Sequence, residues 1–429
     1  MTRAMSRRTF VQATAGAVWA AHGVGVWSQE PAAEVPRPLR VAVMGVNNRG
    51  FHLALAFCER PAVTVTRICD VDSRALEKAV REVSAKQGTA PQGTADFRHA
   101  LDDPEVDILI VATPNHWHVP ATILGVSAGK HVYVEKPCSH TAQEGEWAVA
   151  AARRHNKVVT TGTQRRSWGP IRAAMDCLRA GEIGEVRYAR SWYRSRRTSI
   201  GHGTQGDPPA WLDYELWQGP APRRPYRDNL IHYNWHWHWH WGNGELGNNG
   251  VHALDLARWG LGVDFPTRVT SAGGHYRFDD DQETPDTHMV AFEFGARAIT
   301  WEGVSWSPWG PGGSAFGVTF HGDTGTMELF DVGYRVYDLQ NKVVREVAGG
   351  SAESDHVDDF LRCVRTGGVP NADIEIGHRS ALLCHLGNMA HRTGQVLSVD
   401  PQNGHILQAD PAVTALWGRE YAPGWQPQV

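Results

Sequence analysis

The segment that most constrains the fold lies near residue 45, where a short apolar run meets two glycines. Residues 39–44 are apolar and partly β-branched, which is typical of a buried strand. Gly45 and Gly50 bound a turn, and residues 51–59 have helical composition. A strand, a turn and a helix in this order suit a pyrophosphate, because the turn amides and the helix N-terminus face the anion. The segment therefore predicts a dinucleotide-binding βαβ unit, with an ordinary βαβ turn as the alternative.

An acidic residue supports this prediction. Asp70 lies 20 residues beyond the second glycine and directly follows a predicted strand over residues 63–69. A carboxylate at this position accepts hydrogen bonds from the adenosine ribose and repels a 2′-phosphate. The predicted cofactor is therefore NAD, with NADP as the alternative because Ser73 and Arg74 lie close by. Asn47 replaces the middle glycine of the usual pattern, and asparagine tolerates left-handed backbone geometry.

Strands and helices continue to alternate further along the chain. Residues 106–112 and 131–134 are predicted strands, and residues 120–128 form a predicted helix between them. This alternation implies a parallel sheet with crossovers, whose functional residues gather at the carboxyl ends of the strands. Polar motifs follow both strands. The predicted cofactor-binding residues are Gly45, Asn47, Asn48, Arg49, Gly50, Asp70, Thr113, Pro114, Asn115, His118, Glu135, Lys136 and Gln164.

Further motifs extend the pattern to most of the chain. They are Gly45–Gly50, Asp70, Thr113-Pro114 with His118, Glu135-Lys136-Pro137, and Gly244–His252 with Asp255. With these motifs the chain resembles the Gfo/Idh/MocA family (glucose–fructose oxidoreductase, inositol dehydrogenase and rhizopine catabolism proteins) from Leu39 to Asp400. The resemblance implies an α/β Rossmann domain with a parallel sheet, followed by an α+β domain with a large, mostly antiparallel open sheet. Its sheet face is expected to support a homo-oligomer. Strand patterns that agree with the second sheet cover residues 184–192, 268–276, 288–294, 298–301, 317–321 and 325–330.

Two residues are predicted to handle the hydroxyl proton during hydride transfer. Lys136 follows a strand, and partial desolvation beside a cationic nicotinamide lowers the pKa of a lysine toward neutrality. A solvated surface charge is the alternative for this lysine. His252 is the second candidate, on the first turn of a predicted helix. The family pattern places an Asp four residues before this histidine, whereas here the residue is Asn248, which binds a hydroxyl but accepts no proton. Asp255 and Glu245 are alternative acids.

The run Trp235–Trp241 alternates tryptophan and histidine. On a strand, strict alternation would place three histidines on one face and four tryptophans on the other. We interpret the run as a polar and aromatic wall around a carbohydrate, with packing between the domains as an equal alternative. A metal site is not predicted, because the run offers no carboxylate at regular ligand spacing. The predicted substrate-contacting residues are Lys136, Gln164, Arg165, His236, His238, Asn248 and His252.

The N-terminus has the features of an export signal. Arg7 and Arg8 precede a mildly apolar stretch, rich in Ala and Gly, that reaches about Trp27. This arrangement resembles a twin-arginine (Tat) signal and predicts a periplasmic or otherwise exported protein, with a disordered basic N-terminus as the alternative. The predicted organisation is a signal and linker over residues 1–35, an NAD(P)-binding Rossmann domain over 36–162, an α+β substrate and oligomerisation domain over 163–400, and a tail over 401–429.

Composition narrows the remaining possibilities. The net charge is -4 and the pI about 6.6, so there is no basic excess for binding nucleic acid. No apolar run is long enough to predict an integral membrane segment in the mature chain. The six cysteines show no CxxC spacing and are predicted to be buried free thiols.

The motifs together predict an NAD(P)-dependent oxidoreductase that acts on CH–OH groups of a sugar, an inositol or a sugar derivative, with a tightly bound cofactor. The first alternative is an NAD-dependent glycoside-cleaving enzyme that oxidises a hydroxyl transiently, eliminates the glycosidic group, adds water and returns the hydride. The second alternative is a non-catalytic dinucleotide-binding protein.

Overall fold

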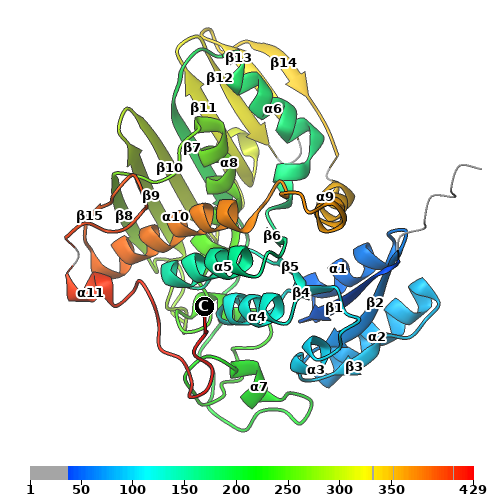
Figure 1. The fold of residues 1–429 in the computed structure, drawn as a ribbon. Coiled ribbons are helices and arrows are strands. Elements are labelled where there is room, and N and C mark those ends of the chain that lie inside the picture. The colour runs from blue at the N-terminus through cyan, green and yellow to red at the C-terminus, as the bar shows by residue number, and fades with distance from the viewer. Residues whose placement is uncertain (1–36, 331–332, 351, 409) are drawn as a thin grey trace, which may run out of the picture. The chain divides into compact units, whose positions relative to one another are not determined.

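The computed structural model describes residues 37–330, 333–350, 352–408 and 410–429. The predicted export signal lies outside these residues. Two sheets organise the described chain (Figure 1): one is built from the N-terminal strands, in blue and cyan, and the other from the green and yellow strands.

The first sheet is parallel throughout and has the strand order β3-β2-β1-β4-β5-β6. Its central strands are buried on both faces: Val41–Val43 and Ile108–Val111 have no exposed surface, as expected where crossover helices cover a parallel sheet. The strands are β1 (Leu39–Met44), β2 (Val63–Cys69), β3 (Gln92–Thr94), β4 (Ile108–Val111), β5 (His131–Val134) and β6 (Val159–Thr161). The helices between them are α1 (Arg49–Cys58), α2 (Ser73–Gln87), α3 (Arg98–Leu101), α4 (Asn115–Ser127) and α5 (Ala142–Arg154).

Within the described residues the second sheet has nine strands, in the order β14-β13-β12-β11-β7-β10-β9-β8-β15. Among the strand pairs described, β10–β7 alone is parallel, so the sheet is mixed and mostly antiparallel. Its strands are β7 (Val186–Arg194), β8 (Arg268–Gly274), β9 (Thr287–Phe294), β10 (Arg297–Val304), β11 (Phe316–Gly322), β12 (Gly325–Phe330), β13 (Gly333–Asp338), β14 (Val343–Val347) and β15 (Leu397–Ser398).

Helices cover one face of this second sheet. They are α6 (Gly169–Arg179), α8 (Val251–Leu261) and α10 (Ile374–Thr393), whose apolar residues share one core with Trp301 and Phe320. The opposite face carries polar pairs, such as Arg190 with Glu302 and Tyr188 with Thr300. The predicted fold class is therefore confirmed, with strand ends that shift by a few residues.

Two late helices pack against the first sheet. Val357 and Phe360 of α9 (Glu353–Thr366) belong to the core that contains Val43, while Ile374 and Ala381 of α10 join the core on the other side. Helices from the C-terminal part of the chain therefore contribute to both hydrophobic cores of the first sheet. The remaining helices, α7 (Tyr214–Gln218) and α11 (Pro411–Thr414), are short.

The strand expected for the Trp/His run does not form. Residues Asn234–Trp237 adopt a 3₁₀ turn, and a further turn follows in which the amides of Trp241 and Gly242 donate to the carbonyl of His238. The side chain of His236 also bonds to the backbone, with Nδ1 2.7 Å from the carbonyl oxygen of Tyr233. Local bonds thus occupy backbone groups that a sheet would pair, and histidines and tryptophans are not sorted onto two faces.

Three further properties concern the described residues. No helix among them is both long and apolar enough to cross a bilayer. The six cysteines are free. Within the same residues, no group of three or more His, Cys, Asp or Glu side chains is placed to hold a metal ion.

Candidate active site

The glycine turn after β1 is shaped by close backbone approach. Gly45 has φ +85°, and a Cβ atom there would lie 2.8 Å from the carbonyl oxygen of Ala112. A Cβ atom on Gly50 would lie 1.9 Å from the carbonyl oxygen of Gly45, so α1 packs directly on the turn. Gly45, and not Asn47, takes the positive φ. The two glycines therefore hold the start of α1 against the carboxyl end of β1, which is the geometry that a pyrophosphate requires.

Asp70 closes this turn from the end of β2. Its carboxylate accepts hydrogen bonds from the backbone amides of Val46 (2.6 Å) and Asp72 (2.9 Å). Burial raises the pKa of Asp70, although both amide bonds favour the charged form. Arg74, which could have compensated a 2′-phosphate, is held by Asp72 at 3.0 Å and lies over the ring of Trp211. The acidic surroundings therefore suit an unphosphorylated ribose.

Glu135 and Arg49 form a charged pair behind the turn. Arg49 Nε donates to Glu135 at 2.7 Å, and its terminal nitrogens donate to Glu353 at the start of α9. Burial works against ionisation of Glu135, but the charges of Arg49 and Lys136 leave its pKa lowered. A Cβ atom on Gly162 would lie 2.7 Å from the Glu135 carboxylate, so β6 also packs tightly on this pair.

Lys136 points its amine toward the start of α8. Its Nζ lies 2.8 Å from the backbone carbonyl oxygen of Asn248 and 3.1 Å from Oδ1 of the same residue. Asn248 belongs to a wide π-helical turn, Leu246–Gly250, that leads into α8. Burial lowers the pKa of Lys136 against the opposing charge of Glu135. The lysine is therefore oriented by an amide instead of a carboxylate, and burial makes its neutral form easier to reach than that of a solvated lysine.

His252 stands one turn further along, in α8. Its Nδ1 atom is buried and has no hydrogen-bond partner among the described residues. Burial, together with the positive charges of Lys136 and Arg165, lowers its pKa well below the usual value. His252 is therefore a neutral imidazole with unused hydrogen-bonding capacity.

His118 connects the motif that follows β4 to the motif that follows β5. One ring nitrogen lies 2.6 Å from the carbonyl oxygen of Pro137, and the other lies 2.9 Å from that of Thr113. Because Thr113 follows β4 and Pro137 follows β5, the ring fixes the two strand ends relative to each other.

A long segment between β7 and the π-helical turn, residues 195–245, supplies the far wall of the site and is called the insertion below. Arg197 Nε donates to Glu245 at 2.5 Å, and the guanidinium lies over the rings of Tyr233 and Trp237. The amide of Asn248 contacts the hydroxyl of Tyr233 at 3.3 Å. These contacts connect the insertion to the turn that holds Lys136.

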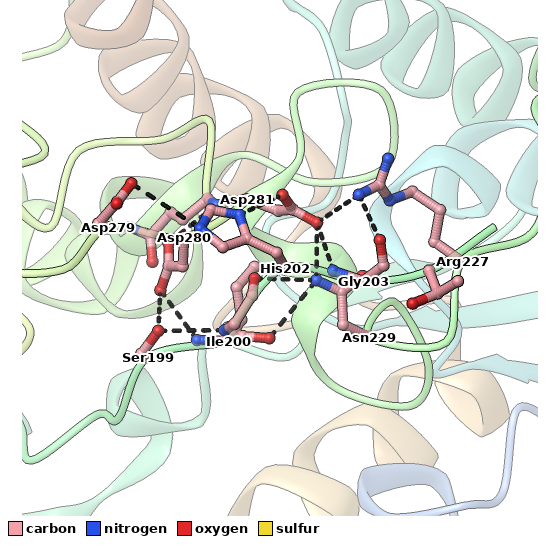
Figure 2. A network of polar contacts seen from close by, with 12 residues as sticks. Ser199, Ile200, His202, Gly203, Arg227, Asn229, Asp279, Asp280 and Asp281 are labelled. Atoms are coloured by element: carbon pink, nitrogen blue, oxygen red, sulfur yellow. Dashed lines mark hydrogen bonds and ion pairs between the residues drawn. The ribbon is translucent and has the colours of Figure 1, made fainter.

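The insertion is fastened by an acidic loop, shown in Figure 2. Asp280 accepts hydrogen bonds from Ser199 Oγ (2.7 Å) and the amide of Ile200 (2.9 Å). Asp281 accepts from the amide of Gly203 (2.8 Å), from Arg227 (2.8 Å) and from Asn229 (3.0 Å). The two aspartates thus tie together two stretches of the insertion that lie about 25 residues apart in the sequence.

These elements enclose a cavity of about 600 Å³. Three buried polar atoms at its wall, Thr113 Oγ1, Gln164 Oε1 and His252 Nδ1, have no partner among the described residues and so remain for a ligand. With the glycine turn and Asp70, they fit a dinucleotide and a polar substrate. The predicted site residues at the wall are Gly45, Asn47, Asn48, Arg49, Asp70, Thr113, Pro114, Asn115, His118, Glu135, Lys136, Gln164, His236, Asn248 and His252.

Three predicted residues lie elsewhere. Gly50 is behind the turn, Arg165 lies over the rings of Phe316 and Trp168, and His238 Nδ1 is 3.7 Å from Glu283. Conversely, Tyr193, Arg197 and Tyr233 line the cavity but were not predicted as site residues. The basic cluster Arg194–Arg197 is the one sequence signal near these residues, and such a cluster is more commonly a solvated loop than a ligand site.

Comparison with known proteins agrees with this geometry. The model of the oxidoreductase family with an NAD-binding Rossmann fold (Gfo/Idh/MocA) matches residues 39–163, and the model of the family's C-terminal alpha/beta domain matches residues 194–287. The two stretches together make up just over half of the chain. The protein therefore belongs to the Gfo/Idh/MocA family of oxidoreductases, and its first domain is an NAD-binding Rossmann domain.

Curated relatives are similar over shorter stretches. A glycosyl hydrolase family 109 protein of Saccharopolyspora erythraea is 36% identical over 115 residues, which are 26% of this chain and 25% of the relative. An alpha-N-acetylgalactosaminidase of Shewanella oneidensis is 29% identical over 174 residues, 39% of this chain and 38% of the relative. The chain thus spans only about a quarter to two fifths of the length of these relatives.

Solved structures share the fold over a longer range. A levoglucosan dehydrogenase in complex with NADH and levoglucosan has a TM-score of 0.67 at 20% identity, covering 85% of this chain and 99% of its own. An aldose-aldose oxidoreductase of Caulobacter crescentus complexed with glycerol has a TM-score of 0.66 at 18% identity, covering 85% and 100%. At these identities the likeness shows a common fold.

Proposed function

We propose that this protein is an NAD-dependent oxidoreductase that oxidises a hydroxyl-bearing carbon of a sugar, an inositol or a sugar derivative. The observation that carries the proposal is that one cavity joins the glycine turn and Asp70 to Lys136 and His252. Bound NAD supplies the hydride acceptor. The chain itself must hold the substrate hydroxyl and receive its proton.

Lys136 is the proposed base. A neutral amine has two N–H groups and one lone pair, and the two oxygens of Asn248 accept from the amine at 2.8 and 3.1 Å. The lone pair is then left to take the hydroxyl proton. His252 is the proposed partner that hydrogen-bonds the same hydroxyl group, because its ring is neutral.

Glycoside cleavage with transient oxidation is the second candidate. It is supported by the curated relatives, which are glycosyl hydrolase family 109 proteins, and by additional proton-transfer groups at the cavity. The carbonyl of Tyr233 can only accept, so Nδ1 of His236 carries the proton and Nε2 keeps a lone pair. His236 can therefore remove the C–H proton that becomes acidic beside a transient ketone, and Tyr233 can protonate the departing oxygen.

One experiment separates these candidates. Cofactor is released from the purified protein by acid and identified by mass, and the near-ultraviolet absorbance of reduced nicotinamide is followed with a panel of free sugars, polyols and aryl glycosides. A lasting absorbance rise with free sugars supports the dehydrogenase. Aglycone release without net absorbance change supports the glycosidase. Absence of bound cofactor together with no binding of added NAD overturns both.

Export and self-association are also part of the proposal. The twin-arginine motif at Arg7 and Arg8 supports transport of the folded holoprotein, and cell fractionation of wild type against Arg7→Lys with Arg8→Lys tests it. Retention of both forms in the same fraction contradicts it. The face of the second sheet opposite α6, α8 and α10 supports a homo-oligomer, which light scattering tests; a monomer at all concentrations contradicts it.

A further inference from the structure

A second cavity lies beside the far end of the Trp/His run. It has a volume of about 420 Å³ and is lined by the start of α5, the last turns of α10, the loop around Arg224 and the segment that follows α11. The run contributes to both cavities: Trp235 and His236 line the first, whereas Trp239 and His240 line the second. The proposed redox chemistry uses no residue of this second cavity.

Three buried acceptor atoms at this cavity have no partner among the described residues. They are His140 Nδ1, Asn243 Oδ1 and Asn388 Oδ1, on side chains that are 7%, 6% and 6% exposed. Buried polar atoms are rarely left unpaired without a ligand or water to satisfy them.

The chemical character of these three atoms follows from their neighbours. The side-chain nitrogen of Asn243 donates to the carbonyl oxygen of His140, and that of Asn388 donates to the carbonyl oxygen of Asn243, each at 2.9 Å. These bonds orient both side-chain amides, so that the atom left without a partner in each is the oxygen. Nε2 of His140 lies 3.1 and 3.3 Å from the carbonyl oxygens of Trp239 and Gly242 and must therefore carry the proton. All three free atoms are acceptors, so their ligand must present hydroxyl or N–H donors.

Positive charge surrounds the same cavity. Arg224, Arg392 and Arg419 line it, together with Arg223, which is paired with Glu215, and the exposed carboxylate of Glu420. Arg419 is bound to Glu144 through Nε and Nη2, but its Nη1 is buried and unpaired among the described residues. Arg392 lies over the ring of Trp239 and has no ion-pair partner within the described part of the chain. A carboxylate is the group that matches these guanidinium donors.

We propose that the second cavity binds a carboxylated sugar, such as a hexuronate, with its hydroxyl groups on His140, Asn243 and Asn388 and its carboxylate on Arg392 and Arg419. A neutral sugar would leave the guanidinium groups unmatched, and an inorganic anion would leave the three acceptors unmatched. This inference concerns binding alone and does not depend on the reaction in the first cavity.

The test is calorimetric titration of the cofactor-loaded protein with glucuronate and galacturonate, compared with glucose, galactose and sulfate. The hexuronates are expected to bind more tightly than the matched neutral sugars and more tightly than sulfate. Arg392→Gln and Asn388→Leu are each expected to weaken hexuronate binding about tenfold or more, because each removes a hydrogen bond to a charged or buried partner. Arg379→Gln, on the same helix but paired with Asp264 and Glu375, is the matched control and should bind as wild type.

A further variant separates the two cavities. Hexuronate binding should persist in Lys136→Ala, whose change lies in the first cavity. Loss of binding in Lys136→Ala with retention in Arg392→Gln would place the hexuronate in the first cavity and overturn the proposal. Equal affinity for sulfate and hexuronates, or no hexuronate binding by wild type, would overturn it as well. Because Arg392 is exposed, its variant is expected to fold even where Asn388→Leu does not.

Discussion

The cofactor half and the substrate half of the first cavity are built in different ways. In the cofactor half, one short stretch makes the turn, and its closing bond joins Val46 to Asp70, 24 residues apart. In the substrate half, Arg197 pairs with Glu245 across 48 residues, and Lys136 reaches Asn248 across 112. Backbone geometry therefore shapes the turn of the first half, which Arg49 also ties to Glu135 and Glu353 from behind, whereas the second half depends on long-range polar pairs throughout. Substitutions in the cofactor half should therefore alter cofactor affinity. Substitutions in the substrate half should alter turnover and substrate binding.

The largest effect is expected from Lys136→Ala. Removal of a general base lowers turnover by about 10²–10⁴-fold, while the glycine turn and Asp70 still bind the cofactor. Steady-state kinetics measure the first quantity, and fluorescence titration with NADH measures the second. Turnover at the wild-type level would show that the substrate half uses another base.

The pH dependence of activity also tests the assignment of Lys136 as the base. Because burial lowers the pKa of Lys136, the neutral form should accumulate below the ordinary range of a lysine. Activity should therefore rise with pH through this lowered pKa and then level off. Asn248→Asp places a carboxylate beside the amine, stabilises its charged form and should move the rise to higher pH. An unchanged profile in Asn248→Asp would contradict the role given to the lysine.

Gly50→Ala tests the cofactor half. The added Cβ atom would meet the Gly45 carbonyl oxygen at 1.9 Å, so the turn must shift, at a cost of about 1–3 kcal/mol in unfolding free energy and with weaker NAD binding. Gly169→Ala is the control, since nothing lies within 4 Å of its Cβ position. Denaturant unfolding measures the unfolding free energy of each variant, and NAD titration measures its cofactor affinity. Equal behaviour of the two variants would refute tight packing at the turn.

Asp70→Asn should alter cofactor choice more than stability. The amide keeps one acceptor oxygen for Val46 or Asp72 but removes the charge that repels a 2′-phosphate. The preference for NAD over NADP should narrow by about tenfold, as one charged hydrogen bond would give. Dissociation constants for both nucleotides provide the measurement, and an unaltered ratio would mean that discrimination lies elsewhere.

The smallest effect is expected at the acidic loop of Figure 2. Asp281→Asn weakens the bonds to Gly203, Arg227 and Asn229, so KM for the substrate should rise about threefold while NAD affinity stays constant.

The pKa of Asp281 is lowered by these bonds, although burial opposes them. Its stabilising contribution is therefore present at neutral pH and is lost as the pH falls below the usual range of an aspartate. His202→Gln, on a mostly exposed partner, should change KM less.

The sequence was informative where short-range rules apply. The strand, turn and helix around Gly45 and the acid at Asp70 follow from periodicity and glycine placement, and the structure brings them to one cavity. The second sheet was predictable through alternation and family resemblance.

The insertion was not predictable in the same way. The pairing of Arg197 with Glu245 depends on where a loop of irregular structure folds back, which no local pattern encodes. The alternation of Trp and His suggested a strand, but turn hydrogen bonds, including one from the side chain of His236, compete successfully with sheet pairing. Tyr233 enters the site as a result of this turn.

The contact between Lys136 and the carbonyl oxygen of Asn248 has an evolutionary consequence. A backbone carbonyl is present whatever side chain stands at position 248. One of the two anchors of the lysine amine is therefore insensitive to substitution there, while the other varies with the side chain. An exchange of the amide for a carboxylate at this position would therefore change the basicity of the lysine while the backbone carbonyl keeps the amine in place.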